Sequence, residues 1–310
     1  MRVFITGGSG LVGRRLIPRL AQRGDHPVVL TRNAAHAADK LGKEIEAVEG
    51  NPTQPGPWME RVAGCDAIVN LVGEGIFNGR WSDTFKATLR DSRIKSTENV
   101  AIAIQKAGAK PHVLVNGSAI GYYGFHGDED LTESSPAGDD FLAKLCIDWE
   151  NSAKPMEAMG VRIVLLRTGV VLDKAGGALA QMMLPFKLFA GGPVGSGKQW
   201  VSWIHHADEV GIILAALDRR QAAGAINATA PNPATNAQLA KALGAAMSRP
   251  SLLPTPGFML RLALGERACL VLGGQRVLPR RAQELGYVFQ FPTIDAALAD
   301  ILAKPAAGAA

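Results

Sequence analysis

Cysteine, aromatic residues and long apolar runs are all scarce in this sequence. Its three cysteines, Cys65, Cys146 and Cys269, are an odd number without Cys-x-x-Cys spacing, which argues against a disulfide framework and against a zinc site. No stretch approaches the roughly 20 uninterrupted apolar residues of a membrane-spanning helix, and the N-terminus does not have the form of a signal peptide. We therefore expect a cytoplasmic protein with reduced thiols, no bound metal and no membrane partner.

The positive charge of the chain is small and evenly spread. The formal net charge is +5, and no basic run is longer than a pair such as Arg14-Arg15. Aromatic residues make up only 6% of the chain, which leaves no stacking platform of the kind that single-stranded nucleic acids need. A modest positive excess suits small phosphate-bearing molecules equally well. We expect a small-molecule substrate and no nucleic acid, while the oligomeric state stays open.

Short apolar runs alternate with amphipathic ones over the first two-thirds of the chain. Strands this rich in Val, Ile and Leu, separated by helices, are typical of a parallel sheet covered on both faces. The fold class predicted is therefore α/β, a doubly wound parallel Rossmann sheet. The expected strands are Arg2–Thr6, Pro27–Thr31, Glu44–Val48, Ala67–Leu71, His112–Val115 and Val161–Leu166, and the expected helices are Leu11–Arg23, a helix capped by Ser82 and running to Ala107, and Asp139–Met159.

The pattern changes after Arg167. A glycine-rich stretch covers residues 176–197, and prolines with short helical segments dominate from Pro231 onward. A strand at Trp200–His206, a helix at Ala207–Leu217 and a strand at Ala225–Ala228 lie between them. We predict a Rossmann domain over residues 1–175, to which 205–230 return, and a smaller mixed substrate-side domain from 176–204 and 231–310.

A glycine-rich turn joins the first strand to the first helix. Gly7 permits a tight turn, Gly10 lets the backbone approach a pyrophosphate, and Gly13 allows the helix to pack closely on the sheet. The helix start then offers free N–H groups and a partial positive charge to the phosphates. This turn in its strand–helix context predicts a dinucleotide site; a turn without a ligand is the alternative. The residues assigned to the cofactor here are Thr6, Gly7, Gly8, Ser9, Gly10, Leu11, Val12 and Gly13.

The end of the second strand indicates which dinucleotide is bound. Proteins specific for NAD place an acidic residue there to bind the ribose 2′-hydroxyl, but this strand ends at Thr31 and Arg32 with no Asp or Glu. The planar guanidinium of Arg32 can instead pair with a 2′-phosphate, although a solvated loop arginine would look the same in sequence. The cofactor predicted is NADP(H).

Taken together, these residues resemble the short-chain dehydrogenase/reductase superfamily in its extended, epimerase-like branch. More narrowly, the chain is similar to atypical epimerase-family proteins that carry a C-terminal domain of unknown function. The resemblance covers nearly the whole chain. Besides the glycine turn, it is carried by Val69–Glu74, Gly79–Ser82, Arg90–Arg93, Gly117–Gly124, Gly138–Leu142, Leu166–Gly169, Gly195–Trp200, Trp203–His205, Ala230–Pro233 and Gly274–Pro279.

The resemblance assigns roles to three groups of residues. It implies that Asn70, Leu71, Val72 and Gly73 form the turn after the fourth strand, where the backbone approaches the cofactor ribose. It places Ser118 just after the fifth strand, where the family's Ser or Thr hydrogen-bonds a substrate carbonyl or hydroxyl. The same resemblance places Arg167 and Thr168 beside the nicotinamide.

One feature of the family is missing. Active members use Tyr-x-x-x-Lys on a helix, where the lysine charge lowers a phenol pKa that is otherwise about 10. No such pattern exists here, because the residues four places beyond Tyr122, Tyr123 and Tyr287 are His, Gly and Phe. On the helix where the pair belongs, Leu142 and Cys146 take the two positions.

Two explanations for the missing pair stay open. The protein is either an oxidoreductase or epimerase with a rearranged acid/base, for which Ser118, Tyr122, Tyr123 and Cys146 are the candidates, or a weakly active or inactive NADP(H)-binding interaction protein. Paired tyrosines also line or pack a cleft without reacting. A free cysteine is often a small buried hydrophobe, and reactivity would need a lowered thiol pKa.

The substrate site is expected between the carboxyl edge of the sheet and the later segment. Trp rings stack on sugars or bases, and a Lys meets phosphate or carboxylate groups, whereas a hairpin turn and core tryptophans would give the same pattern. A nucleotide sugar is the substrate class that the resemblance implies. The candidate lining residues are Arg80, Trp81, Lys198, Trp200 and Trp203.

Overall fold

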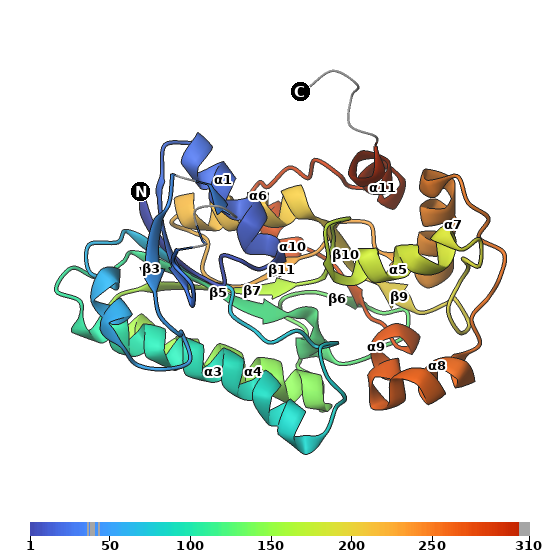
Figure 1. Cartoon of the computed structure of the whole chain (residues 1–310), viewed down its shortest axis with the longest axis horizontal. Helices are drawn as coiled ribbons and strands as arrows, with labels where there is room; N and C mark the ends of the chain where they lie inside the picture. Colours follow the sequence, from blue (N-terminus) through green and yellow to red (C-terminus); the bar gives the residue numbers. More distant parts are fainter. Residues whose placement is uncertain (36, 38–40, 43, 304–310) are drawn as a thin grey trace.

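A seven-stranded parallel sheet forms the centre of the molecule (Figure 1). The computed structural model describes residues 1–35, 37, 41–42 and 44–303. The sheet has the order β11-β7-β5-β4-β1-β2-β3. Its strands are β1 (Arg2–Thr6), β2 (His26–Thr31), β3 (Glu46–Glu49), β4 (Ala67–Asn70), β5 (Val113–Ala119), β7 (Arg162–Thr168) and β11 (Gly224–Ala228).

The two faces of the sheet are buried by different helices. Along β1, Val3 and Ile5 pack toward α1 (Leu11–Gln22) and α6 (His206–Asp218), whereas Phe4 packs toward the opposite face. That face is covered by α3 (Asp83–Lys106), α4 (Phe141–Ala153) and the 3-10 helix η1 (Pro57–Val62). Alternate side chains of one strand thus enter two apolar cores, which is why the strands are apolar throughout. The predicted doubly wound Rossmann fold is confirmed.

The strand order reverses direction at β1. From β1 the chain builds β2 and β3 on one side and then crosses over to β4, β5, β7 and β11 on the other. The connections that leave the carboxyl ends of β1 and β4 therefore diverge, and in open α/β sheets ligands bind in the crevice between them. The glycine turn after β1 lies at this crevice.

Several elements differ from their expected bounds for local reasons. β5 continues to Ala119, so Ser118 lies within the strand rather than after it. The helix expected at 139–159 ends at Ala153, and Pro155 starts the 3-10 helix η3 (Lys154–Met159), because proline cannot donate the helical hydrogen bond. The strand expected at 200–206 divides into β9 (Trp200–Val201) and β10 (Trp203–His205).

The C-terminal residues form a second lobe with its own apolar core. Leu179, Trp203, Leu243 and Leu298 are buried together in it. Three two-stranded sheets pair β8 (Val170–Leu172) with β10, β9 with β12 (Ala234–Thr235), and β6 (Asp130–Leu131) with β13 (Arg276–Val277). The proposed domain boundary after residue 175 stays a prediction. The remaining elements are η2 (Ile120–Tyr123), α5 (Gly177–Lys187), α7 (Asn236–Met247), α8 (Gly257–Leu264), η4 (Gly265–Ala268), α9 (Cys269–Leu272), α10 (Arg280–Glu284) and α11 (Ile294–Leu302).

Neither a membrane span nor a metal cluster is found among the residues that the structure describes. None of these helices is both long and apolar enough to cross a bilayer. In the same ranges, no three His, Cys, Asp or Glu side chains converge in a way that could hold a metal ion.

Candidate functional site

The glycine turn is built so that side chains are excluded from it. Gly7 has a φ of +71°, and a Cβ there would lie 2.7 Å from the carbonyl oxygen of Leu71. A Cβ on Gly13 would lie 2.5 Å from the carbonyl oxygen of Gly8. Both distances are far below contact, so each glycine is required by the fold itself, and the turn is pressed against both α1 and the β4 turn.

Gly10 is less crowded than Gly7 and Gly13. It is the N-cap of α1 with an ordinary φ of −72°, and a Cβ there would meet only the Gly7 carbonyl oxygen, at 3.1 Å. No side chain of the described residues caps α1, and its first turn contains no acid. Backbone N–H groups at this helix start are therefore available to an anion, and the helix dipole favours one.

A groove of about 650 Å³ opens beside this turn. The predicted residues Gly7, Ser9, Gly10, Thr31, Arg32, Leu71, Val72 and Gly73 line it. Arg32 is exposed there and makes no ion pair with the described part of the chain. The prediction missed Asn51, Pro52, Thr53, Glu74 and Ser92, which also line the groove; Asn51 to Thr53 follow the carboxyl end of β3, a position that a parallel sheet would have indicated. A glycine cradle, an open helix start and a cationic end fit a phosphorylated dinucleotide.

Buried polar side chains brace the strand ends beneath the groove. Thr6 donates to Asn70 at 2.5 Å, and Asn70 donates to Asn116 at 2.7 Å and to Thr97 of α3 at 3.0 Å. All four residues are fully buried. The amide of Asn70 thus ties β1, β4, β5 and α3 together. Thr6 and Asn70, predicted to touch the cofactor, are not among the residues that line the groove; they hold the two turns that do line it.

Arg93 supports the β4 turn from α3. A Cβ on Gly73 would lie 3.0 Å from the Arg93 guanidinium carbon. That guanidinium donates to the carbonyl oxygens of Leu89 and Glu74 and lies 5.1 Å from the ring centre of Trp149. Burial lowers its pKa. The close approach explains why the turn has glycine at position 73.

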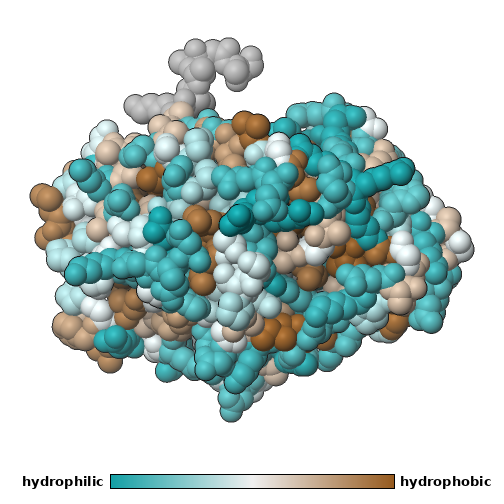
Figure 2. All heavy atoms as spheres, turned by 180° about the vertical axis from the view of Figure 1, so that it is seen from behind, coloured by the Kyte–Doolittle hydropathy of each residue, from teal (hydrophilic) through white to brown (hydrophobic). Residues whose placement is uncertain are grey.

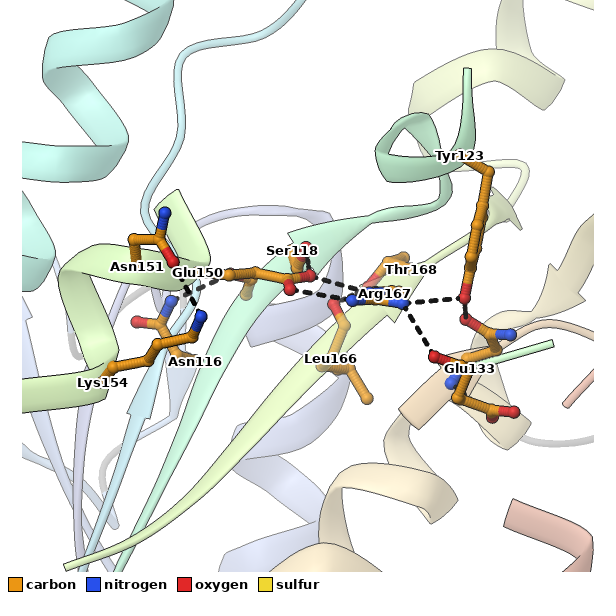
Figure 3. Close-up of polar contacts among 12 residues, drawn as sticks. Asn116, Ser118, Tyr123, Glu133, Glu150, Asn151, Lys154, Leu166, Arg167 and Thr168 are labelled. Carbon is orange, nitrogen blue, oxygen red and sulfur yellow. Dashed lines mark hydrogen bonds and ion pairs between the residues drawn. The ribbon is translucent and has the colours of Figure 1, made fainter. Parts of the chain in front are cut away.

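A second polar network surrounds Arg167 at the ends of β5 and β7 (Figure 3). Its guanidinium donates twice to the Glu150 carboxylate of α4, at 2.8 and 2.9 Å. Ser118 donates to the same carboxylate at 2.7 Å. Arg167, Glu150 and Ser118 are each only 4% exposed. Removing one partner of such a buried ion pair costs about 3–5 kcal/mol, because the other charge is left without compensation. The pair therefore holds its geometry in the folded protein. The prediction missed Glu150, although its place four residues after Cys146 puts it on the same helix face.

The two adjacent tyrosines occupy different environments. Tyr123 is fully buried, donates to Asn227 at 2.7 Å and accepts from Arg167 at 3.0 Å. Burial raises its pKa to about 12 despite the nearby Arg167. The ring of Tyr122 lies under the Arg167 guanidinium at 3.4 Å, and its phenol oxygen makes no hydrogen bond with the described residues. Tyr122 is only half-buried. Of the two phenols, only that of Tyr122 is available to a ligand.

Cys146 lies where the family's lysine would be. It is buried, and it and Leu142 face Gly121 of η2: a Cβ on Gly121 would lie 3.8 Å from its sulfur and 3.3 Å from Leu142 Cβ. Burial, and then the neighbouring Glu150 carboxylate, raise the thiol pKa to about 12. This environment keeps the thiol protonated, which does not favour a reactive thiolate.

A buried acid of α6 contacts the end of β7. Glu209 is 1% exposed, one of its carboxyl oxygens accepts from Thr168 at 2.8 Å, and the other has no partner among the described residues. Burial raises its pKa to about 8. The carboxyl is therefore neutral near pH 7 and fixes Thr168 without adding charge at the end of β7.

We expect that Glu209→Gln abolishes the fall in stability that the buried Glu209 carboxyl causes as the pH rises. Because the folded-state pKa of about 8 exceeds the ordinary 4.5, the unfolded chain releases this proton first. The free energy of unfolding then falls as pH rises through that window, by about 1.4 kcal/mol per pH unit. The amide still accepts from Thr168. In urea unfolding, the free energy of unfolding of the variant should rise relative to that of the native protein between about pH 5 and about pH 8. A difference that stays constant over this range would contradict the prediction.

The predicted substrate residues do not all face one space. Trp203 is a correction: it is fully buried in the core of the C-terminal lobe and donates to the Asn232 carbonyl. Trp200 is half-buried, donates to Asp128 at 2.7 Å and lies under Arg276. Trp81 donates to the Ile76 carbonyl, whereas Arg80 and Lys198 are exposed. The role of Arg80, Trp81, Lys198 and Trp200 in substrate binding stays a prediction.

Comparison with known families agrees with this geometry. Residues 3–228 match the family model described as the NAD dependent epimerase/dehydratase family. The chain belongs to this family. Residues 255–301 match a domain of unknown function (DUF1731). The resemblance to an epimerase-family protein with such a C-terminal domain is therefore confirmed.

Relatives of this family match almost the full length of the chain. The chloroplastic epimerase family protein SDR39U1 homolog of Arabidopsis thaliana is 43% identical over 308 residues, which cover 97% of this chain and 87% of that protein. Epimerase family protein YfhF of Bacillus subtilis is 39% identical and covers 98% of both. A crystal structure of human epimerase family protein SDR39U1 with NADPH has a TM-score of 0.85 at 38% identity, covering 97% of this chain and 99% of that one.

Proposed function

We propose that this chain binds NADP(H) in the groove beside the glycine turn and uses it in an oxidoreductase or epimerase reaction on a small molecule. The observation that carries the proposal is the pairing of an uncapped α1 start with Arg32 in one groove. A 2′-phosphate would pair with Arg32, and the pyrophosphate would rest on the α1 N–H groups. The NADPH in the crystal structure of the human relative supports the same cofactor.

Tyr122 is the proton donor and acceptor in this proposal. Its phenol is available, and the Arg167 guanidinium lies on its ring at 3.4 Å. When the phenol gives its proton to a substrate oxygen, negative charge develops on the ring system and the fixed cation stabilises it. The Glu150 carboxylate holds Arg167 in place. Arg167 therefore substitutes electrostatically for the missing family lysine.

The bound cofactor would supply or accept the hydride in such a reaction. Ser118 already gives its hydroxyl hydrogen to Glu150, so its oxygen can only accept a hydrogen bond from a ligand. A substrate hydroxyl suits this acceptor. A nucleotide sugar, rich in hydroxyls, is the substrate class we propose.

Arg32→Ala should discriminate between the two dinucleotides. The loss of a charge-assisted contact to the 2′-phosphate is worth about 1.5–3 kcal/mol, which is roughly a tenfold to hundredfold weaker NADPH affinity. NADH affinity should stay within about twofold, because NADH carries no 2′-phosphate. Quenching or enhancement of nicotinamide fluorescence on titration measures both. Arg19→Ala, an exposed change on α1 outside the groove, is the matched loss of charge and should alter neither affinity.

Turnover separates an enzyme from a cofactor-binding protein. Protein loaded with NADPH is incubated with a panel of small carbonyl compounds, which can accept a hydride. Protein loaded with NADP+ is incubated with nucleotide sugars, because oxidation of a sugar hydroxyl needs an oxidised cofactor to accept the hydride. NADPH absorbance and product isomers are followed in both. Consumption of NADPH, or epimerisation without net consumption, supports the proposal. Tight NADPH binding without either reaction across the panel would instead favour the alternative function, a cofactor-responsive interaction protein.

A further inference from the structure

A cluster of exposed apolar side chains lies on the C-terminal lobe. Eight of the 13 large hydrophobic side chains that are exposed in the described residues belong to this cluster. Exposed apolar side chains usually occur singly over a protein surface, whereas most of those described here come from one lobe. We define this apolar patch as Leu184, Leu188, Phe189, Leu252, Leu253, Phe258, Met259 and Leu262. Their side chains are between 50% and 88% exposed.

The patch comes from three segments, and direct contacts join the first two of them. The backbone N–H of Leu253 donates to Gly191 at 3.1 Å, which joins the α7–α8 connection to the chain after α5. The Arg249 guanidinium lies 4.4 Å from the ring centre of Phe189. α8 begins directly after this pairing, at Gly257. In the reversed view of Figure 2, hydrophobic (brown) atoms lie at the left and lower-left edge, on the side where α5 and α8 lie, and other brown atoms are spread over the rest of this face.

The side chains of the patch project outward rather than line a groove. α8 has no buried residue at all, although it carries three members of the patch. Phe189 is held at a φ of +57°, a backbone conformation that few non-glycine residues adopt. This conformation ends α5, because the N–H of Ala190 donates to the carbonyl oxygen of Pro185 at 2.9 Å, and it leaves the phenyl ring exposed to solvent. Projecting anchors are suited to insertion into a fluid surface, whereas a bound peptide helix needs a hollow.

Positive charge predominates in the segments that build the patch, and the nearest acid in sequence, Glu266 just after α8, is paired with Lys86. The sequence contains no Asp or Glu from Lys174 to Ala207 or from Arg219 to Gly265, but these two segments contain eight Lys and Arg residues. Lys187, Arg249 and Arg261 lie within the segments that build the patch, and none makes an ion pair with the described residues. These three unpaired cations would be complemented by an anionic partner.

We propose that this patch docks the protein on an anionic lipid bilayer, with the apolar side chains inserted among the lipids and the three cations at the phosphates. Apolar anchors beside unpaired Lys and Arg are the composition of interfacial attachment. A second copy of the chain fits less well, because a two-fold contact would bring like charges together. The proposal departs from our expectation of no membrane partner, which considered only segments able to span a bilayer.

Flotation of the full chain with vesicles tests this docking. Phosphatidylcholine vesicles are compared with vesicles containing about 30% phosphatidylglycerol, and we expect roughly a hundredfold stronger partition into the anionic ones, about fivefold for each cation. Leu262→Glu should lower that partition by more than about tenfold. Val288→Glu, an equally exposed apolar residue outside the patch, should change it by less than about twofold. Lys187→Gln with Arg261→Gln should reduce the preference for anionic vesicles while leaving NADPH binding intact.

Two results would overturn the docking proposal. One is the absence of partition into anionic vesicles at low salt. The other is an equal loss for Leu262→Glu and Val288→Glu, which would mean that net charge alone drives the binding. A dimer in solution that Leu262→Glu dissociates, in a protein that ignores vesicles, would assign the patch to a second copy instead. NADPH affinity measured in parallel keeps this outcome separate from the proposed function.

Discussion

Tyr122→Phe should lower kcat by a factor of about 10² to 10⁴, the usual contribution of a positioned proton donor. The change removes only the phenol oxygen, which has no hydrogen-bond partner among the described residues, and keeps the ring under Arg167. The folded state should therefore be as stable as before, and NADPH affinity should not change. The measurement is kcat and KM on the substrates found in the panel, together with urea unfolding and NADPH titration.

Tyr123→Phe is the matched control, because it deletes the same atom one residue away. In the native protein, the Tyr123 phenol donates to Asn227 and accepts from Arg167 in a fully buried site. Leaving these partners unsatisfied costs about 1–3 kcal/mol, so this variant should lose stability, and any effect on kcat should be the smaller one. Full turnover by Tyr122→Phe would exclude Tyr122 as the acid/base.

Gly10→Ala should weaken NADPH binding by roughly 30-fold to 1000-fold, corresponding to about 2–4 kcal/mol. Gly10 has an ordinary φ and meets only the Gly7 carbonyl oxygen, at 3.1 Å, so the apoprotein can fold with a methyl group there. The methyl group would occupy the side from which a pyrophosphate approaches the α1 N–H groups. Affinity is measured by NADPH fluorescence, and folding by thermal unfolding without cofactor.

Gly108→Ala provides the control for Gly10→Ala. A Cβ at this position would meet nothing within 4 Å, and its φ is not in the left-handed region. Its NADPH affinity should equal that of the native protein. A Gly10→Ala variant that binds NADPH equally well would show that the glycine turn does not hold the pyrophosphate.

The sheet could be predicted from the sequence because its signals are local. Uniformly apolar strands such as Val28–Leu30 alternate with amphipathic helices, and this pattern alone indicates burial on both faces. The ends of elements were less accurate. β5 extends past the expected Val115 to Ala119, because pairing with β7 continues along the strand end and brings Ser118 beside Arg167. The residues of β5 alone carry no pattern that indicates how far this strand pairs with β7.

The candidate site was predicted where one short motif builds it. The glycine turn needs only residues 7–13. Gly7, Ser9 and Gly10 line the groove, whereas the predicted residues Gly8, Leu11, Val12 and Gly13 are not among its lining residues. The Arg167 network joins residues far apart in sequence, such as Tyr123 and Asn227, which are 104 positions apart. Trp203 shows the converse: a tryptophan that stacks on a sugar and a tryptophan of the core look the same in sequence, and tertiary packing places this one in the core.

The most direct measurement is a fluorescence titration of purified, nucleotide-free protein with each dinucleotide. Uncapped amides at the α1 start and the Arg32 guanidinium predict saturable NADPH binding in the micromolar range, at least about tenfold tighter than NADH. A protein that responds to neither dinucleotide at about millimolar concentration would contradict the account.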